Sequence, residues 1–261
     1  MGYIRKWWST PNGRVVEEYH SGRLPPPGGR ESRRRATPEE MARANQRQKE
    51  RNTQLLLMNN FSVNDYWITL TYRKEERPED MQQCKKQFRR FIGAVRKEYR
   101  QQGEELKWIR NIEKGSRGGW HIHLIVNRIQ DTDLIIRRAW SYGGVHHALM
   151  YQEGGFRKLA EYLSKTVRLK DHETGEDIRE SSYSTSRNLA RPPAHKQEMS
   201  GKTFEERKIR IPRGLYLDKE SLYEGINPYT GYPYRYYTLL ILQDKRRKHA
   251  DRTHIRGIRD G

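Results

Sequence analysis

The chain has almost no cysteine and no long apolar run, and each absence excludes a class of protein. Cys84 is the only cysteine in 261 residues, so neither an intrachain disulfide nor a zinc site built from cysteines can form. No segment approaches the ~18–20 apolar residues of a membrane-spanning helix, and the first residues lack the apolar core of a secretory signal. These features predict a cytosolic protein without a membrane partner, in which Cys84 fills the core.

Apolar residues are scarce throughout, whereas basic residues are abundant. The set AVILMFWYC makes up 33% of the chain, and the mean hydropathy is −1.12. Such values favour one compact domain flanked by polar arms. Lys and Arg number 52 against 33 Asp and Glu, which gives a formal charge of +19 and an isoelectric point near 10.0. A surface this basic attracts polyanions, so nucleic acid is the expected partner.

Residues 1–37 show no apolar periodicity and contain a proline- and glycine-rich run followed by three arginines at 33–35. This composition predicts a basic arm without regular structure. A capping signature at Thr37 then opens a helix that reaches about Leu57. The first half of this helix is nearly all polar, so it either faces solvent or lies against a phosphate backbone.

The middle of the chain predicts seven elements of an α+β fold. Aromatic and β-branched residues alternate at 65–72, and an apolar stripe recurs at three- and four-residue steps between 78 and 103. The expected strands are 65–72, 106–113, 120–127 and 145–151, and the expected helices are 78–103, 131–140 and 155–167. This βαββαβ order with an added helix is that of an antiparallel split βαβ sheet of the ferredoxin or RRM type. Within 131–140, Leu134, Ile135 and Ala139 are expected to face the core.

Two histidines stand two residues apart on the apolar strand, directly after a glycine-rich turn. Side chains alternate along a strand, so His121 and His123 share a face. If the hairpin turns near Arg117, Glu113 lies opposite His121. The residues expected on this shared face are 109, 111, 113, 121, 123 and 125.

Glu113, His121 and His123 then offer one oxygen and two nitrogen ligands and leave other coordination positions open. This set suits Mn²⁺ or Mg²⁺, with water and phosphate oxygens completing the shell, although Zn²⁺, Co²⁺ and Ni²⁺ also bind such ligands. A metal that is open on one side can polarise a phosphoryl oxygen.

The helix expected at 155–167 offers a nucleophile for such a phosphate. Tyr162 and Lys165 are three residues apart and share a helix face, so the ammonium can approach the phenol and the phosphate that it attacks. A free phenol has a pKa of about 10 and is a weak nucleophile at neutral pH, but a nearby cation and a metal both favour its anion.

Together these motifs resemble those of the HUH endonucleases, and among them the rolling-circle replication initiators of small plasmids and phages. The resemblance lies in the motif His121-Ile122-His123, in Tyr162 and Lys165 behind it, and in the first-strand segment 68–71. It implies a metal-dependent nick in single-stranded DNA at a replication origin, in which tyrosine becomes linked to the 5′-phosphate and a 3′-hydroxyl is released.

The roles that the resemblance implies fall on matching positions of this chain. Tyr162 is the nucleophile, and Lys165 orients or neutralises the phosphate. His121, His123 and, by position, Glu113 hold the Mn²⁺ or Mg²⁺. The chain departs from two-tyrosine phage initiators, because Lys158 and Leu159 stand where a companion tyrosine would lie. A one-tyrosine mechanism is therefore expected.

The resemblance also suggests a division of the chain. Residues 61–170 form an HUH catalytic domain whose last helix carries the nucleophile. Residues 1–60 are a basic N-terminal arm and helix, and residues 171–261 are a C-terminal extension with a basic tail that can pack on the catalytic domain. No ATP-binding Gly-x-x-x-x-Gly-Lys-Ser/Thr loop is present. A host helicase and DNA polymerase are therefore expected partners, in the cytoplasm of a bacterial host.

Several alternatives stay open at this point. Relaxases and single-strand transposases use the same chemistry, and a βαββαβ sheet with exposed aromatics can also be a non-catalytic module that stacks single-stranded nucleic acid. His146 and His147 face opposite sides of a strand, so at most one of them contacts substrate at the same site. Further strands are expected at 208–217 and 234–242. The tyrosines between 229 and 237 either stack on bases or alternate toward a core.

Overall fold

The computed structural model describes residues 2–21, 37–115, 119–150, 155–165, 168–170, 177–179, 181–201, 204, 209–227 and 232–242. Its helices are α1 (Pro38–Asn60), α2 (Met81–Gln101), α3 (Thr132–Ala139) and α4 (Arg157–Ser164), with a 3-10 turn, η1, at Lys74–Glu76. Its strands are β1 (Tyr3–Thr10), β2 (Gly13–His20), β3 (Tyr66–Thr71), β4 (Trp108–Lys114), β5 (Trp120–Val126), β6 (Val145–Leu149), β7 (Arg168–Lys170), β8 (Asp177–Arg179), β9 (Ser181–Thr185), β10 (Ala194–Met199), β11 (Leu215–Ile226) and β12 (Pro233–Ile241).

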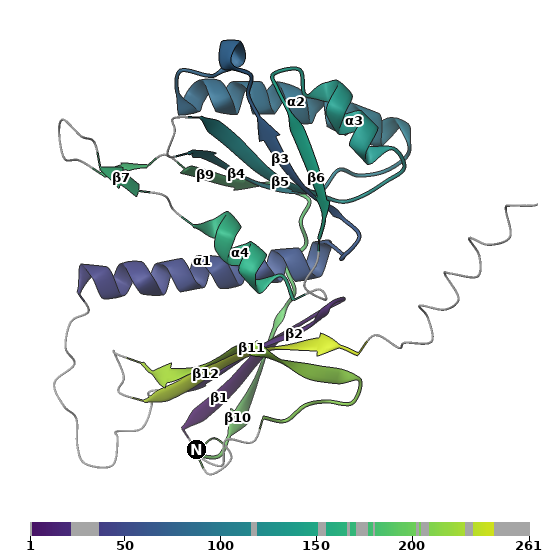
Figure 1. The fold of residues 1–261 in the computed structure, drawn as a ribbon. Coiled ribbons are helices and arrows are strands. Elements are labelled where there is room, and N and C mark those ends of the chain that lie inside the picture. Colours follow the sequence, from purple (N-terminus) through teal and green to yellow (C-terminus); the bar gives the residue numbers. More distant parts are fainter. Residues whose placement is uncertain are drawn as a thin grey trace, which may run out of the picture.

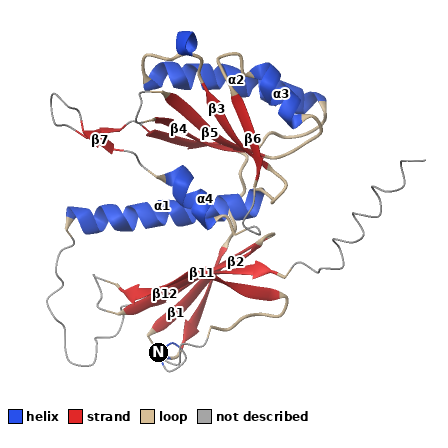
Figure 2. Cartoon of the chain, in the orientation of Figure 1, coloured by secondary structure: helices blue, strands red, loops and turns tan. Residues whose placement is uncertain are grey.

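These elements form four layers (Figure 1). Helices α2 and α3 cover one face of a five-stranded sheet, β6-β3-β5-β4-β9, which we name the central sheet. Helices α1 and α4 lie between it and a second five-stranded sheet, β10-β1-β2-β12-β11, which we name the terminal sheet; Figure 2 shows these two helices in blue between the red strands. Neighbouring strands are antiparallel in both sheets, so the predicted α+β class is confirmed.

The central sheet comes from the middle of the chain. Its elements follow one another as β3-α2-β4-β5-α3-β6-α4, and β9 pairs with β4 at the edge. The fifth strand thus comes from the Ser-rich segment 181–185, for which the sequence predicts no strand. The identification of this segment as a nuclease core stays a prediction.

One face of the central sheet is apolar and packs on α2. Alternate strand residues such as Ile68 and Leu70 are fully buried there. Helix α2 begins after Asp80, whose side chain accepts a hydrogen bond from the Gln83 backbone at 2.7 Å. Its predicted stripe is buried, and burial raises the pKa of the Cys84 thiol to about 12. Cys84 therefore fills the core, as the sequence predicts.

Helix α1 changes character along its length because its second half lies between the two sheets. It begins with the predicted capping box, in which Thr37 and Glu40 exchange hydrogen bonds. All six residues from 53 to 58 are buried, which is the pattern of a helix covered on every side. Among them, Gln54 donates to the Gly155 carbonyl at 2.8 Å and to Thr238 Oγ1 at 3.2 Å.

The expectation that residues 1–37 form an irregular arm is wrong for residues 3–20, which form β1 and β2. These strands lack a simple apolar alternation because polar side chains on them have partners in α1 and in the neighbouring strand. Glu17 of β2 pairs with Arg51 of α1, and Arg5 of β1 donates to Glu18 of β2 at 2.5 Å. The arginines at 33–35 and the basic tail lie outside the described residues.

Three further predictions need correction. The strand expected at 208–217 begins only at Leu215 and runs to Ile226. In α3, Leu134 is 51% exposed, whereas Ile135 and Ile136 are buried, because the helix turns its 132, 135 and 136 positions toward the sheet. Helix α4 ends at Ser164 rather than at 167, and residues 166 and 167 lie outside the described residues.

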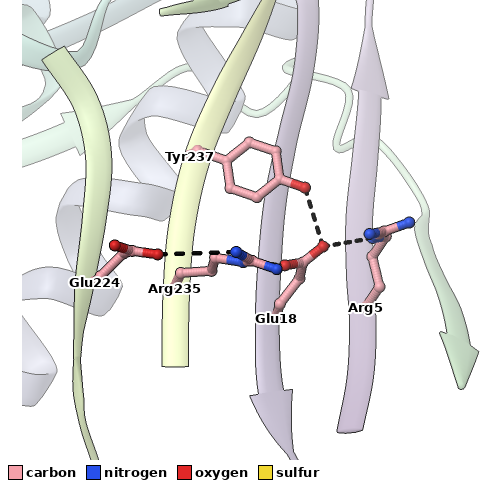
Figure 3. A network of polar contacts seen from close by, with 5 residues as sticks. All are labelled: Arg5, Glu18, Glu224, Arg235 and Tyr237. Carbon is pink, nitrogen blue, oxygen red and sulfur yellow. Dashed lines mark hydrogen bonds and ion pairs between the residues drawn. The ribbon is translucent and has the colours of Figure 1, made fainter. Parts of the chain in front are cut away.

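A network of charged residues crosses the terminal sheet (Figure 3). Glu18, which is fully buried, accepts hydrogen bonds from Arg5 Nε at 2.5 Å and from the Tyr237 hydroxyl at 3.1 Å, and it pairs with Arg235. Arg235 Nη1 also lies 3.8 Å from Glu224 Oε1. The register of β1, β2, β12 and β11 brings these side chains into one row. The row joins both ends of the described chain.

Glu18→Gln is expected to destabilise the fold by about 3 kcal/mol, because it leaves the buried Arg235 guanidinium without its countercharge. The free energy of unfolding in urea measures this loss. Glu220→Gln is the matched control, since Glu220 pairs with Lys158 where both side chains are more than half exposed, at 71% and 63%. It is expected to cause no measurable change. Equal effects of the two variants would contradict a stabilising role for the row.

Candidate active site

The face of the central sheet that is turned toward α4 carries the predicted site residues. In the β4–β5 hairpin Glu113 lies opposite His121, and Asn111 lies opposite His123. The predicted register is therefore confirmed. On the other side of β5, Thr69 of β3 lies opposite His123. Cross-strand partners share a face, so these five side chains point to the same side of the sheet.

Glu113 and His123 contact each other directly. Glu113 Oε1 lies 2.9 Å from His123 Nε2, and Thr69 Oγ1 lies 3.3 Å from His123 Nδ1. The contact with Glu113 uses a proton on Nε2; when the proton is on Nδ1 instead and is donated to Thr69, Nε2 carries the lone pair that a metal needs. Thr69 belongs to segment 68–71, which is part of the resemblance described above. Its contact with Nδ1 can orient the His123 imidazole.

Helix α4 delivers Tyr162 to this pair. The apolar side of the helix, with Leu159 and Leu163, is buried. The Tyr162 hydroxyl lies 2.8 Å from His123 Nε2 and donates to Glu113 Oε1 at 3.2 Å. The Tyr162 ring is 36% exposed, and its centroid lies 5.4 Å from that of Trp67. The structure thus joins the tyrosine on α4 with two of the three predicted metal ligands.

The charges of the site change the pKa of the Tyr162 phenol. Burial and the neighbouring Glu113 carboxylate raise the pKa of the Tyr162 phenol. The hydrogen bond from His123 holds the pKa of Glu113 below its usual value despite partial burial. The sequence predicts that a nearby cation lowers the tyrosine pKa, whereas the side chains alone raise it. Forming the nucleophilic anion therefore requires added positive charge or a proton acceptor.

The donor set fits a divalent metal in part. Ligands about 2.1 Å from an octahedral ion lie roughly 3 Å from one another, and the 2.9 Å between Glu113 Oε1 and His123 Nε2 matches this spacing. The ring centroid of His121 lies 6.4 Å from that of His123. Within the described ranges no group of three His, Cys, Asp or Glu is already gathered around a metal position. Glu113 and His123 fit adjacent positions, and His121 would join them by turning its ring.

The His121 imidazole lies beside the two glycines that flank the turn of the hairpin. A Cβ added at Gly115 or at Gly119 would lie 3.8 or 3.6 Å from His121 Nε2, which is ordinary van der Waals contact. The glycine-rich turn that the sequence shows thus lies beside the histidine it precedes. Residues 116–118 at its tip lie outside the described residues.

Lys165 and the second histidine pair lie apart from the contacts among Glu113, His123 and Tyr162. Lys165 is exposed and follows the last helical residue, Ser164, with a ψ of 127°. It therefore does not share a helix face with Tyr162, contrary to the prediction from the sequence. No hydrogen bond or ion pair joins its ammonium to another described residue.

His146 lies opposite Thr69 on the site face, whereas His147 faces the other side, where its ring centroid lies 5.6 Å from that of Tyr66. Only His146 is on the side of the site.

Asn111 is a residue of this face whose role the sequence does not indicate. Its side chain is 1% exposed, and neither amide atom has a hydrogen-bond partner among the described residues. Strand parity predicts the face it occupies, but no sequence signal shows that the amide is buried beside His123. A buried amide without a partner costs about 1–3 kcal/mol, so such groups mark a bound water, an ion or a catalytic use.

His121 is expected to titrate below the ordinary histidine pKa of about 6.5. Burial is the larger cause of the lowered pKa and the neighbouring His123 the smaller, whereas Glu113 opposes both. The neutral imidazole therefore persists to lower pH than in a free histidine, which keeps His121 able to bind metal there. NMR titration of the metal-free protein measures the midpoint. Glu113→Gln should lower the midpoint further, and a midpoint at or above 6.5 would contradict this electrostatic description.

Comparison with known proteins gives one match. Residues 65–167, from the start of β3 to just beyond α4, match the family model described as Replication-associated protein ORF2/G2P. The matched segment contains Glu113, His121, His123, Tyr162 and Lys165, and the match supports a role in the initiation of replication with DNA as partner. Neither the curated proteins nor the solved structures contain a match. No described helix combines the length and the apolar character that crossing a membrane requires.

Proposed function

We propose that this protein is a site-specific endonuclease that nicks and rejoins single-stranded DNA to initiate rolling-circle replication. The observation that carries the proposal is the position of the Tyr162 hydroxyl, within 3.2 Å of both Glu113 and His123. A tyrosine held against a carboxylate and an imidazole, in a segment that matches a replication-associated family, suits covalent catalysis on a phosphodiester.

In the proposed reaction the Tyr162 oxygen attacks the scissile phosphorus, and the bond from phosphorus to the 3′-oxygen breaks. A tyrosyl phosphodiester to the 5′ end forms, while the 3′-oxygen takes up a proton and leaves as a hydroxyl. The phenolic proton passes to the Glu113 carboxylate, to which Tyr162 donates in the structure, and the carboxylate returns it to the leaving 3′-oxygen. One phosphodiester replaces another, so attack by the 3′-hydroxyl in the reverse direction rejoins the strand.

Mn²⁺ or Mg²⁺ held by Glu113, His123 and His121 would supply positive charge beside the phosphate and the phenol. Two features of the site favour binding of such a metal. The contact of Thr69 with His123 Nδ1 favours a free lone pair on Nε2, and the lowered pKa of Glu113 keeps its carboxylate ionised at neutral pH. The exposed Lys165 ammonium, at the end of α4, is proposed to hold the phosphate in line.

The released 3′-hydroxyl would serve a host DNA polymerase, and a host helicase would unwind the template. With Lys158 and Leu159 one turn before Tyr162, the proposed mechanism uses one tyrosine. The same chemistry in a relaxase or a single-strand transposase differs in its DNA substrate rather than in these residues.

The experiment that tests the proposal is a nicking reaction with Mn²⁺ and a labelled single-stranded oligonucleotide from the replicon that encodes the chain. A denaturing gel separates free DNA from DNA linked to protein. The expected products are a fragment with a free 3′-hydroxyl and a fragment linked to the protein, and both should be absent in chelator. Cleavage without any protein-linked fragment would overturn the proposed covalent mechanism.

A further inference from the structure

A groove of about 660 Å³ lies between the first half of α1, one end of α4 and the terminal sheet. This volume falls within the range of roughly 300–1,000 Å³ that is usual for ligand sites. Helix α1 contributes Arg43 and Arg47, α4 contributes Arg157, and the terminal sheet contributes Tyr223 and Tyr234. The helices therefore contribute guanidinium groups to the groove, and the terminal sheet contributes phenol rings together with Arg235.

Arg47 connects the two sides. Its Nη1 donates to the Tyr234 hydroxyl at 2.8 Å, and its Cζ lies 5.8 Å from the centroid of the Tyr223 ring. The two tyrosine rings are 5.6 Å apart at an angle of 40°. Tyr223 is 49% exposed, so about half of its surface is accessible to a ligand. Exposed aromatic rings beside arginines are the elements on which single-stranded nucleic acids stack.

Carboxylates also line the groove, but several of them have partners. Glu17 pairs with Arg51, and Glu50 accepts a hydrogen bond from Gln46 at 2.8 Å. Glu18, the buried centre of the row in the terminal sheet, pairs with Arg5 and Arg235. By contrast, none of the ion pairs between described residues uses the three arginines named above as lining the groove. Glu40 and Glu161 also line the groove, so a bound phosphate would meet carboxylates as well as these three guanidinium groups.

The groove adjoins the helix that carries the proposed nucleophile. Arg157 and Glu161 of α4 line the groove, whereas Tyr162 contacts His123 on the central sheet. At a rise of 1.5 Å per residue, Arg157 and Tyr162 are roughly 8 Å apart along the helix axis, and they point to different sides of α4. A DNA strand held at Tyr162 would pass around α4 to reach the groove.

We propose that this groove binds single-stranded DNA that flanks the nick, with bases stacked on Tyr223 and Tyr234 and phosphates on Arg43, Arg47 and Arg157. That the bound DNA is the strand that flanks the nick rests on the proposed function, but binding of single-stranded DNA to the groove does not require cleavage. The groove accounts for two features that the sequence left open. The polar half of α1 lies on this groove, and Tyr234 faces it while Tyr237 is buried in the core. Tyr229 lies outside the described residues.

Binding of fluorescein-labelled oligothymidine, followed by anisotropy, tests the proposal. One probe has about 16 nucleotides and a second about 4. The measurement uses Tyr162→Phe protein so that cleavage does not change the probe. Arg47→Ala combined with Tyr223→Ala is expected to weaken binding of the longer probe roughly tenfold or more, and Tyr223→Trp should retain it. The matched control is Arg90→Ala, on the exposed side of α2 beyond the central sheet, which is expected to change binding far less.

Three outcomes decide the question. Unchanged binding of the longer probe by the double variant, with the thermal melting temperature also unchanged, would overturn the proposal. Loss of binding to a labelled oligoglutamate, with DNA binding retained, would overturn it in favour of a protein partner. A protein that fails to nick but binds oligothymidine through Arg47 and Tyr223 would contradict the proposed chemistry and leave the groove proposal supported.

Discussion

Tyr162→Phe is expected to abolish both nicking and covalent capture of single-stranded DNA, lowering the nicking rate by roughly 10⁴-fold or more. The substitution removes the one oxygen that lies 2.8 Å from His123 and 3.2 Å from Glu113. The ring and its contact with Trp67 remain, so the fold and the DNA-binding surface should be retained. A denaturing gel that separates protein-linked from free DNA measures both activities together.

Tyr142→Phe is the matched control for this variant. Tyr142 lies on the α2 and α3 side of the central sheet, where its ring contacts Trp140 at 5.1 Å, far from the hairpin histidines. It should nick at the wild-type rate. If Tyr162→Phe still nicks and still becomes attached to DNA, another residue is the nucleophile.

His121→Ala combined with His123→Ala is expected to abolish cleavage while largely sparing DNA binding. His123 alone contacts both Glu113 and Tyr162, so His123→Ala should by itself lower Mn²⁺ affinity and nicking by more than about 100-fold. Glu113→Gln removes the negative charge of the pair and should have a similar effect. Isothermal titration with Mn²⁺ and single-turnover nicking measure the two losses separately.

His195→Ala provides the control for the loss of an imidazole. His195 stacks on Trp7 in the terminal sheet, with ring centroids 5.5 Å apart, and should leave Mn²⁺ affinity and nicking unchanged. Chelation is the complementary test, because it removes the metal without changing a residue. Full nicking activity in excess chelator would contradict a metal-dependent mechanism, whatever the histidine variants do.

The hairpin is the part of the site that the sequence predicts best. Strand parity and a short glycine-rich turn are local features, and together they determine that Glu113 lies opposite His121. The approach of Tyr162 to His123 is not local, because it depends on how α4 packs against the sheet. Sequence spacing predicts the tyrosine helix, but the hydrogen bonds at 2.8 and 3.2 Å come only from the tertiary structure.

The terminal sheet shows where sequence patterns stop being informative. Strand β2 pairs with β12 near the other end of the described chain, and β1 pairs with β10. Register between such distant strands is set by tertiary contacts such as the pairing of Glu18 with Arg5 and Arg235, which interrupts the apolar alternation of the strands. The groove beside Arg47 depends on the same packing, so the sequence alone does not assign a role to the tyrosine cluster or to the polar half of α1.

The most direct measurement is peptide mass spectrometry of the trapped protein–DNA adduct, after digestion of both the protein and the bound strand. The proposed function predicts a nucleotide linked through a 5′-phosphate to Tyr162 and to no other residue. A nucleotide on a different side chain, such as Tyr183 on the same face of the central sheet, or cleavage without any adduct, would contradict it.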